Sequence, residues 1–158
     1  MEIISLIDRP ELMQPAIQYF WKCWGSASNF KFYEDCILYS VQDKSRLPMF
    51  YVLLHEERIV GSYALLTNDI ISRQDLMPWL ACLYVNEEHR GQGIASQLLQ
   101  HGLAEANRLG YQQLHLSTDL ENFYERKGWL YLTDGYNVMG EAIKIYTCKT
   151  AQSSSKSS

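Results

Sequence analysis

The stretch from residue 80 to residue 110 constrains this chain more than any other. An apolar run ends at Val85, a turn with two glycines follows at residues 91–93, and a long amphipathic segment then stops at Gly110. Apolar residues in that segment recur at steps of three and four, which predicts a helix over residues 97–109 with Gly110 at its C′ position. A strand, a glycine turn and a helix must therefore follow one another here.

A glycine turn that opens a helix is suited to bind an anion. The first N–H groups of a helix have no partner within it, and the helix dipole favours negative charge at that end. Glycines let a ligand approach the backbone closely, and an arginine just before the turn can pair with a phosphate. The sequence thus predicts a phosphate-binding loop made of Arg90, Gly91, Gln92, Gly93, Ile94, Ala95 and Ser96.

Two other interpretations of the glycine turn stay open at this point. One is a dinucleotide-binding fingerprint, but its third glycine position is Ser96 here. The carboxylate-ended strand expected ~20 residues further on also falls in the predicted helix. The other interpretation is a helix start that needs glycine only for the shape of its turn.

Two motifs in this chain resemble the GNAT superfamily of N-acetyltransferases. The acetyl-CoA pyrophosphate loop of that superfamily has Arg or Gln, two residues, Gly, one residue, and Gly or Ala, which Arg90, Gly93 and Ala95 match. Residues 121–129 are similar to its second signature, a helix ending Phe-Tyr-Glu-x-x-Gly followed by Phe or Trp, with Tyr124 as the tyrosine. The two motifs stand in the order that the superfamily has.

The resemblance implies an α/β (α+β) fold with a mixed, mostly antiparallel sheet of about six to seven strands and about four flanking helices. It also implies a parallel central strand pair that splays apart to admit the thioester arm of acetyl-CoA. The hydrophobic pattern agrees with this order of elements. It predicts strands at residues 2–7, 48–55, 58–67, 79–85, 111–116, 129–133 and 141–148, helices at 10–24, 30–41 and 97–109, and a polar loop at 68–78. The resemblance implies a further helix at 121–127.

The resemblance further implies an N-acetyltransferase that moves acetyl from acetyl-CoA directly to a primary amine of a small molecule, peptide or protein. Backbone groups of Leu83, Tyr84 and Val85 would pair with the pantetheine arm and polarise the thioester carbonyl. Tyr124 matches the residue that protonates the departing thiolate in many members, and a phenol is a neutral donor at pH 7. Ser117 stands where members usually carry Asn, and we expect its hydroxyl to hydrogen-bond in place of that amide.

The general base is less well defined. An attacking ammonium must first lose a proton, and many members use a Glu or Asp on or beside the central strand. Residues 79–85 contain no carboxylate, so the candidate bases are Asp69 and Asp75 in the preceding loop. Glu34 is a third candidate and ranks after them. The missing strand carboxylate leaves two alternatives open: a non-catalytic acyl-CoA-binding or regulatory module, and a protein-interaction domain of the same fold.

Composition limits the other function classes. The 158 residues are 47% hydrophobic and 20% charged, as expected for one globular domain over residues 1–150 with a disordered Ser-rich tail at 151–158. The net charge of −4 without a basic cluster argues against nucleic acid as a partner. No apolar run has the length of a membrane span, and the N-terminus lacks a basic leader. We expect a cytoplasmic monomer or homodimer.

The four cysteines do not have metal-ligand spacing, so we expect no metal site. Cys82 lies in the strand before the glycine turn. It could form an acetyl-cysteine intermediate, but a small apolar side chain in the core is the simpler interpretation, since cysteine is often buried.

Overall fold

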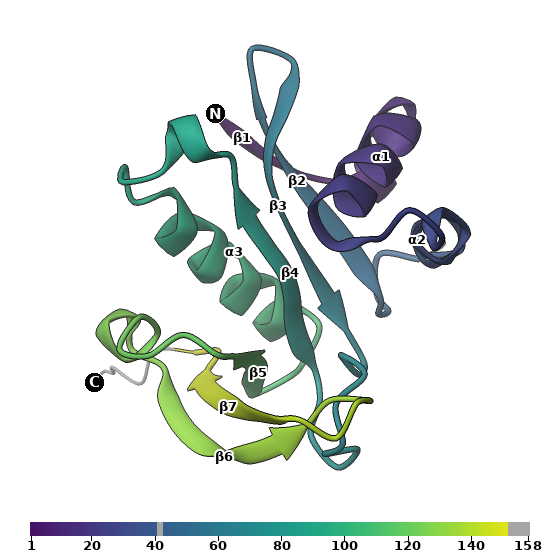
Figure 1. Ribbon diagram of the computed structural model, residues 1–158. Helices are drawn as coiled ribbons and strands as arrows, with labels where there is room; N and C mark the ends of the chain where they lie inside the picture. Colours follow the sequence, from purple (N-terminus) through teal and green to yellow (C-terminus); the bar gives the residue numbers. More distant parts are fainter. Residues whose placement is uncertain (41–42, 152–158) are drawn as a thin grey trace. The chain divides into compact units, whose positions relative to one another are not determined.

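The computed structural model describes residues 1–40 and 43–151, and Figure 1 shows its elements. Within these residues the strands form a seven-stranded mixed sheet in the order β1-β2-β3-β4-β5-β7-β6, and three α-helices accompany it. β4 and β5 are parallel, in a sheet that is otherwise mostly antiparallel. The predicted fold class is therefore confirmed. The bounds are β1 Glu2–Ser5, α1 Met13–Trp24, α2 Phe30–Leu38, β2 Met49–His55, β3 Arg58–Leu66, β4 Trp79–Val85, α3 Ile94–Arg108, β5 Gln113–Thr118, β6 Leu130–Tyr136 and β7 Ala142–Lys149.

The chain divides into two compact units. The first unit contains Met1–Leu65 and Cys82–Leu98, and the second contains Leu66–Ala81 and the chain from Leu99 onward. Both β4 and α3 contribute residues to each unit. None of the helices in the described ranges is long and apolar enough to cross a membrane.

In the first unit, β1, β2 and β3 form an antiparallel ladder against which α1 packs. The rings of Phe20 on α1 and Phe50 on β2 meet edge to face, with centroids 5.2 Å apart. α1 ends at Trp24 as predicted, and Gly25 follows because a Cβ there would lie 2.3 Å from the Trp21 ring. The buried apolar stripe of α1 consists of Ala16, Ile17 and Phe20.

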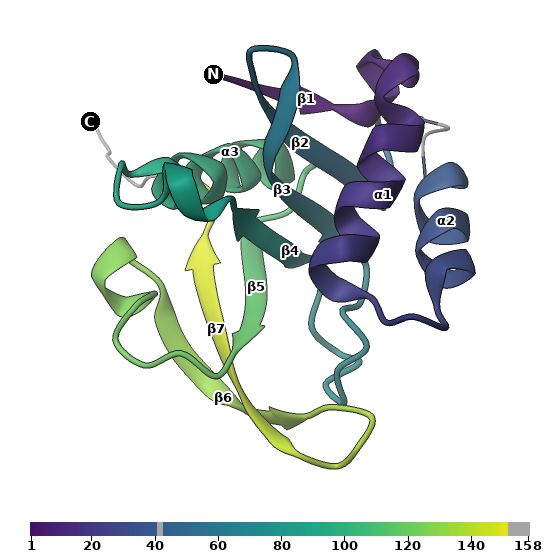
Figure 2. The same cartoon turned by 45° about the horizontal axis from the view of Figure 1, so that its top comes forward.

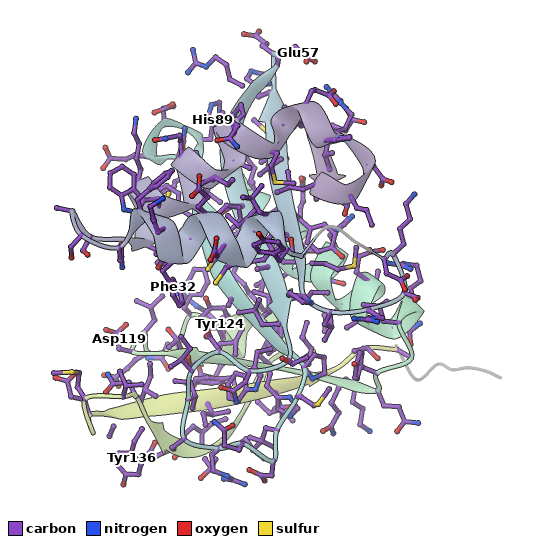
Figure 3. The ribbon with its side chains drawn as sticks, turned by 90° about the vertical axis from the view of Figure 1, so that its right-hand side faces the viewer. Phe32, Glu57, His89, Asp119, Tyr124 and Tyr136 are labelled. Atoms are coloured by element: carbon purple, nitrogen blue, oxygen red, sulfur yellow. The ribbon has the colours of Figure 1, made fainter. Side chains whose placement is uncertain are left out.

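The β2–β3 hairpin confirms the predicted pair of strands and their two-residue turn. Glu56 and Glu57 have φ of 52° and 63°, as a type I′ turn requires at both central positions. Glu57 lies at the tip of the hairpin (Figure 3). The ladder is irregular at Gly61, where the register shifts and an added Cβ would lie only 3.0 Å from the carbonyl oxygen of Tyr84.

Helix α3 begins three residues earlier than predicted, at Ile94, and ends close to its predicted end. The N–H of Gly110 bonds to the carbonyl of Asn107, and the N–H of Tyr111 bonds to that of Ala106, both at 3.0 Å. This is the Schellman pattern, and the φ of 95° at Gly110 confirms its role as C′ residue.

In the second unit, β5, β7 and β6 run side by side, and the β6–β7 hairpin forms their outer part (Figure 2). The parallel β4–β5 register places Trp79 opposite His115. Trp79 also packs in a small core with Ile71 and Ile145. This core fixes the loop between β3 and β4 to the β7 strand.

The helix predicted over residues 121–127 is wrong: only a single 3₁₀ turn, Glu125–Lys127, forms there. Asn122 and Gly128 have φ of 63° and 89°, so left-handed residues bound a stretch too short for a helix nucleus. The two strands predicted after it are nevertheless present as β6 and β7.

The final hairpin is shifted from its predicted position. The first of its two strands is predicted to end at residue 133, but Asp134, Gly135 and Tyr136 also belong to β6, and the turn follows at 137–141. Gly135 lies within this strand. A side chain would not fit at that position, because an added Cβ would be only 2.7 Å from the side chain of Ile145. The Asn137 Oδ1 accepts the N–H groups of Met139 and Glu141, which forms the actual turn.

Smaller differences concern element ends. α2 stops at Leu38 rather than at Val41, and Val41 lies outside the described residues. Asn29 is the N-cap residue of α2, but its side chain accepts the N–H of Ser26 instead of capping the helix. β5 begins at Gln113, two residues later than predicted. Of the predicted tail, residues 152–158 also lie outside the described ranges.

Candidate active site

The glycine turn has the geometry that an anion-binding helix start requires. Gly91 and Gly93 have φ of 80° and 78°. The N–H of Gln97 bonds to the Gly93 carbonyl at 3.2 Å, so Gly93 is the N-cap residue of α3. The N–H groups of Ile94 and Ala95 then have no acceptor inside the helix, and a glycine N-cap has no side chain to accept them.

Both glycines stand in open space. A Cβ added to either would meet no atom within 4 Å. The glycines are therefore required for their left-handed backbone and not to relieve crowding, and the space beside them is available to a ligand.

Arg90 is held at the C-terminal end of β4. Its Nε donates to the Val85 carbonyl at 2.8 Å, and its guanidinium carbon lies 5.2 Å from the centre of the Tyr84 ring. The carbonyl contact uses one of five N–H donors. The side chain is thus positioned next to the turn, with four of its N–H donors not used by this contact.

Asn86 begins the loop and was not singled out by the sequence. Its N–H donates to the Val60 carbonyl at 2.8 Å, and its Oδ1 accepts the hydroxyl of Tyr19 at 2.5 Å. The Tyr19 ring also meets the Tyr84 ring edge to face. These bonds tie the start of the loop to β3 and to α1, and an Asn directly after a buried strand is the one sequence signal that could have indicated it.

The central strand β4 contains a left-handed residue at Cys82, whose φ is 56°. The Cys82 carbonyl accepts the hydroxyl of buried Ser62 at 2.9 Å. A non-glycine residue in this conformation is strained, and such strain is often found at functional sites. Cys82, Leu83 and Tyr84 are only half-buried, although almost every residue of β4 is apolar.

Tyr124 lies in an aromatic cluster of the second unit. It is 8% exposed, and its ring contacts those of Phe123, Trp129 and Tyr146. Burial raises the pKa of the Tyr124 hydroxyl to about 12. The phenol therefore stays protonated over the physiological range and can donate a hydrogen bond.

The structure brings two predicted site residues together in the second unit. The Ser117 hydroxyl lies 3.5 Å from Oδ2 of Asp69. Burial raises the pKa of Asp69 to about 6, while the contact with Ser117 opposes that rise. A carboxylate with this pKa is ionised at pH 7 and still basic enough to accept a proton.

The other two candidate bases are less suitable. Asp75 is exposed and receives two hydrogen bonds from Arg73, which lower the pKa of its carboxyl. Glu34 lies half-buried on α2 in the first unit. Asp69 is the candidate base whose surroundings favour proton transfer near neutral pH.

Comparisons with known proteins identify the family. A family model described as an acetyltransferase (GNAT) domain matches residues 47–129, which is more than half of the chain. The chain belongs to the GNAT acetyltransferase family.

Individual relatives agree with this assignment. The GNAT chain is 33% identical over 84 residues to N-alpha-acetyltransferase 30 of Schizosaccharomyces pombe, covering 50% of this chain and 55% of that protein. It thus spans about half the length of this relative. Its fold is similar to that of aminoglycoside 6'-acetyltransferase type Ii, with a TM-score of 0.73 and 16% identity over 98% of this chain and 100% of the other. An aminoglycoside 6'-N-acetyltransferase complexed with coenzyme A gives a TM-score of 0.71 at 14% identity, over 98% and 100% of the two chains.

Proposed function

We propose that this GNAT chain transfers acetyl from acetyl-CoA directly to a primary amine. The observation that carries the proposal is the left-handed glycine N-cap of α3 beside Arg90, which leaves the first N–H groups of the helix without acceptors in the helix, next to glycines that stand in open space. Because the anionic pyrophosphate of acetyl-CoA complements such a helix start, residues Arg90 to Ser96 are assigned to it. Several solved structures with this fold have coenzyme A or acetyl-CoA bound.

The chemical step requires a base and a donor. We assign Asp69 to take the proton from the ammonium, so that the amine nitrogen can attack the thioester carbonyl. The C–S bond then breaks as the amide forms, the thiolate receives a hydrogen bond and a proton from Tyr124, and the second proton lost by the amine nitrogen restores the Tyr124 phenol. A phenol with a pKa near 12 is a weak acid, so its main contribution is the hydrogen bond to the developing thiolate.

The remaining assignments concern the acyl arm. Backbone groups of Leu83, Tyr84 and Val85 would pair with the pantetheine and polarise the thioester carbonyl. The strained Cys82 is adjacent to them, and its left-handed backbone departs from regular strand geometry, which supports a role for this part of β4 in binding a ligand. Ser117 acts on Asp69 rather than on CoA in this proposal, because their side chains are in contact.

Calorimetric titration of acetyl-CoA tests the proposal with a matched pair of variants. Gly93→Ala and Gly110→Ala both place a Cβ on a left-handed residue in open space, at opposite ends of α3. Both should lose about 1 kcal/mol of stability from backbone strain. Only Gly93→Ala should weaken acetyl-CoA binding, by about tenfold or more, because only Gly93 lies at the anion site.

Three outcomes distinguish the alternatives. Loss of affinity in Gly93→Ala alone, together with acetyl transfer to an amine, supports the enzyme. Acetyl-CoA binding without transfer to any amine would indicate a non-catalytic acyl-CoA-binding module. Absence of binding by the wild-type protein would contradict both and leave an interaction domain of the GNAT fold.

A further inference from the structure

A short turn connects the end of β4 to the anion loop, residues 90–96. It is the 3₁₀ turn η3, Glu87–His89, and none of its residues is buried (Figure 1). The N–H of His89 donates to the Asn86 carbonyl at 2.9 Å, and the N–H of Arg90 closes the turn. Such turns have poor hydrogen-bond geometry, and one without buried residues gains little from packing. The orientation of η3 therefore depends on what holds its first residue.

Asn86, at the start of η3, uses its side chain for a distant partner. An Asn in this position commonly caps the turn that follows it, but no side-chain cap bond forms here. Its Oδ1 instead accepts the hydroxyl of Tyr19, which lies 67 positions earlier in the chain. Its N–H donates to the Val60 carbonyl. Asn86 is thus held by β3 through its backbone and by α1 through its side chain.

Tyr19 is presented from a firmly packed part of α1. Ile17 and Phe20, on either side of it in the helix, are completely buried. Burial raises the pKa of the Tyr19 hydroxyl above its ordinary value, and the neighbouring Cys23 and Tyr84 add to that rise. The hydroxyl therefore stays protonated and donates to Asn86 at every physiological pH.

The anchor of Arg90 lies directly beside Asn86. The Val85 carbonyl, which accepts the Nε of Arg90, belongs to the same peptide group as the Asn86 N–H. Any movement of Asn86 therefore moves this anchor as well. Because Arg90 is exposed and an arginine side chain has many rotamers, few other contacts limit where its guanidinium lies.

The Tyr84 ring provides a second connection between α1 and Arg90. Tyr19 and Trp24 each meet this ring edge to face, with centroids 6.2 Å apart in both pairs. The guanidinium carbon of Arg90 lies 5.2 Å from the centre of the same ring. Tyr19 therefore contacts both supports of Arg90, the Tyr84 ring directly and the Val85 carbonyl through Asn86.

We propose that Tyr19 is a positioning residue for the anion loop, and that its hydrogen bond to Asn86 holds Arg90 where it binds the pyrophosphate of acetyl-CoA. Without this bond, η3 and Arg90 would adopt further orientations in the free protein. The ligand would then bind only the fraction with the correct orientation, which weakens its apparent affinity. This inference rests on the proposed function, because it assigns the anion loop to acetyl-CoA.

Calorimetric titration of acetyl-CoA tests the role of Tyr19 with a matched pair of variants. Tyr19→Phe removes only the hydroxyl and should raise the Kd for acetyl-CoA about threefold, as expected for the loss of one hydrogen bond. Tyr51→Phe removes a hydroxyl of the same unit that donates to the sulfur of Met49 at 3.5 Å. Its Kd should equal that of the wild type, and thermal unfolding shows whether both variants are folded.

Double-mutant cycles show whether Tyr19 acts through Asn86 and Arg90. Asn86→Ala removes the other partner of the bond, so adding Tyr19→Phe to it should not weaken acetyl-CoA binding further. In an Arg90→Ala protein the residue to be positioned is absent, so Tyr19→Phe should again leave the Kd nearly unchanged. A merely structural role of the hydroxyl would instead add its full factor in both backgrounds.

A truncated ligand separates this inference from the function on which it rests. S-acetylpantetheine lacks the pyrophosphate, so its Kd, measured by displacement of acetyl-CoA, should be the same in Tyr19→Phe and the wild type. Equal weakening of both ligands, additive effects in the cycles, or an unchanged Kd for acetyl-CoA in Tyr19→Phe would overturn the positioning role and leave the acetyl-CoA site intact. A wild-type protein that does not bind acetyl-CoA would remove the proposed function, and this inference with it.

Discussion

The glycine loop of the first unit and the Asp69–Ser117 pair of the second differ in how the chain builds them. At the loop, the left-handed glycines and the start of a helix supply the N–H donors for an anion, and the glycines stand in open space. At Asp69, burial of the side chain makes the carboxylate more basic, since desolvation raises the pKa of the carboxyl to about 6. The comparison teaches that a binding site made of backbone N–H groups depends on the local sequence. The shifted pKa of a side chain depends instead on residues that lie far away in the chain.

The largest effect should come from removing the tuned carboxylate. Asp69→Asn should lower kcat at pH 7.5 about 100-fold or more, since positioned general bases contribute 10²–10⁴. The affinity for acetyl-CoA should not change, because the loop is built independently. Steady-state kinetics and calorimetry check the two expectations.

The pH profile sharpens this test. The wild-type rate should rise with pH through about 6, because the carboxyl must be ionised to accept a proton. That limb should be absent in Asp69→Asn. Asp75→Asn serves as control, since Asp75 is exposed and paired with Arg73; a larger loss in this variant would assign the base to Asp75 instead.

A smaller effect is expected at the proton donor. Tyr124→Phe should reduce kcat about tenfold, because the thiolate loses a hydrogen bond. Tyr146→Phe removes a hydroxyl from the same aromatic cluster, one that donates to Glu125 at 2.5 Å, and should cost stability without changing kcat. Equal turnover of Tyr124→Phe and the wild type would remove the donor role.

The loop should respond more weakly to loss of one side chain than to loss of its backbone geometry. Arg90→Ala should raise KM for acetyl-CoA about fivefold, because the N–H groups of the helix start remain. Arg126→Ala is the matched control, since its Nε also donates to a backbone carbonyl at 2.8 Å. If both variants behave alike, the guanidinium of Arg90 has no specific role.

The smallest effect concerns the partner of the base. The Ser117 hydroxyl lowers the pKa of Asp69, so Ser117→Ala should move the acid limb of the rate profile upward by a few tenths of a pH unit. The rate above that limb should be unchanged. A shift toward lower pH would show that the contact between the two side chains does not stabilise the carboxylate.

Much of the architecture follows from local sequence. Periodicity and residues that favour positive φ determine the β2–β3 hairpin, the extent of α3 and the glycine turn before it. A short stretch of sequence contains both signals. Gly135 shows the limit of such reasoning. Asp-Gly is a common turn sequence, but packing against Ile145 places this glycine within a strand.

The candidate site was predictable to a similar extent. The loop residues follow from the motif, and Asp69 was one of three candidate bases. Only the fold distinguishes Asp69 from Asp75, because one is buried and the other is paired with an arginine. The strain at Cys82 has no clear sequence signal, since it depends on tertiary contacts.

The glutamate turn of the β2–β3 hairpin has a practical consequence for protein engineering. Two successive residues with side chains adopt a left-handed backbone at Glu56 and Glu57, where Asn-Gly is the preferred sequence. Replacing the pair by Asn-Gly should relieve about 1 kcal/mol of strain and raise the melting temperature by about 2–4 °C. The hairpin tip therefore offers a way to make the protein more tolerant of heat without altering any residue that the proposal assigns to catalysis.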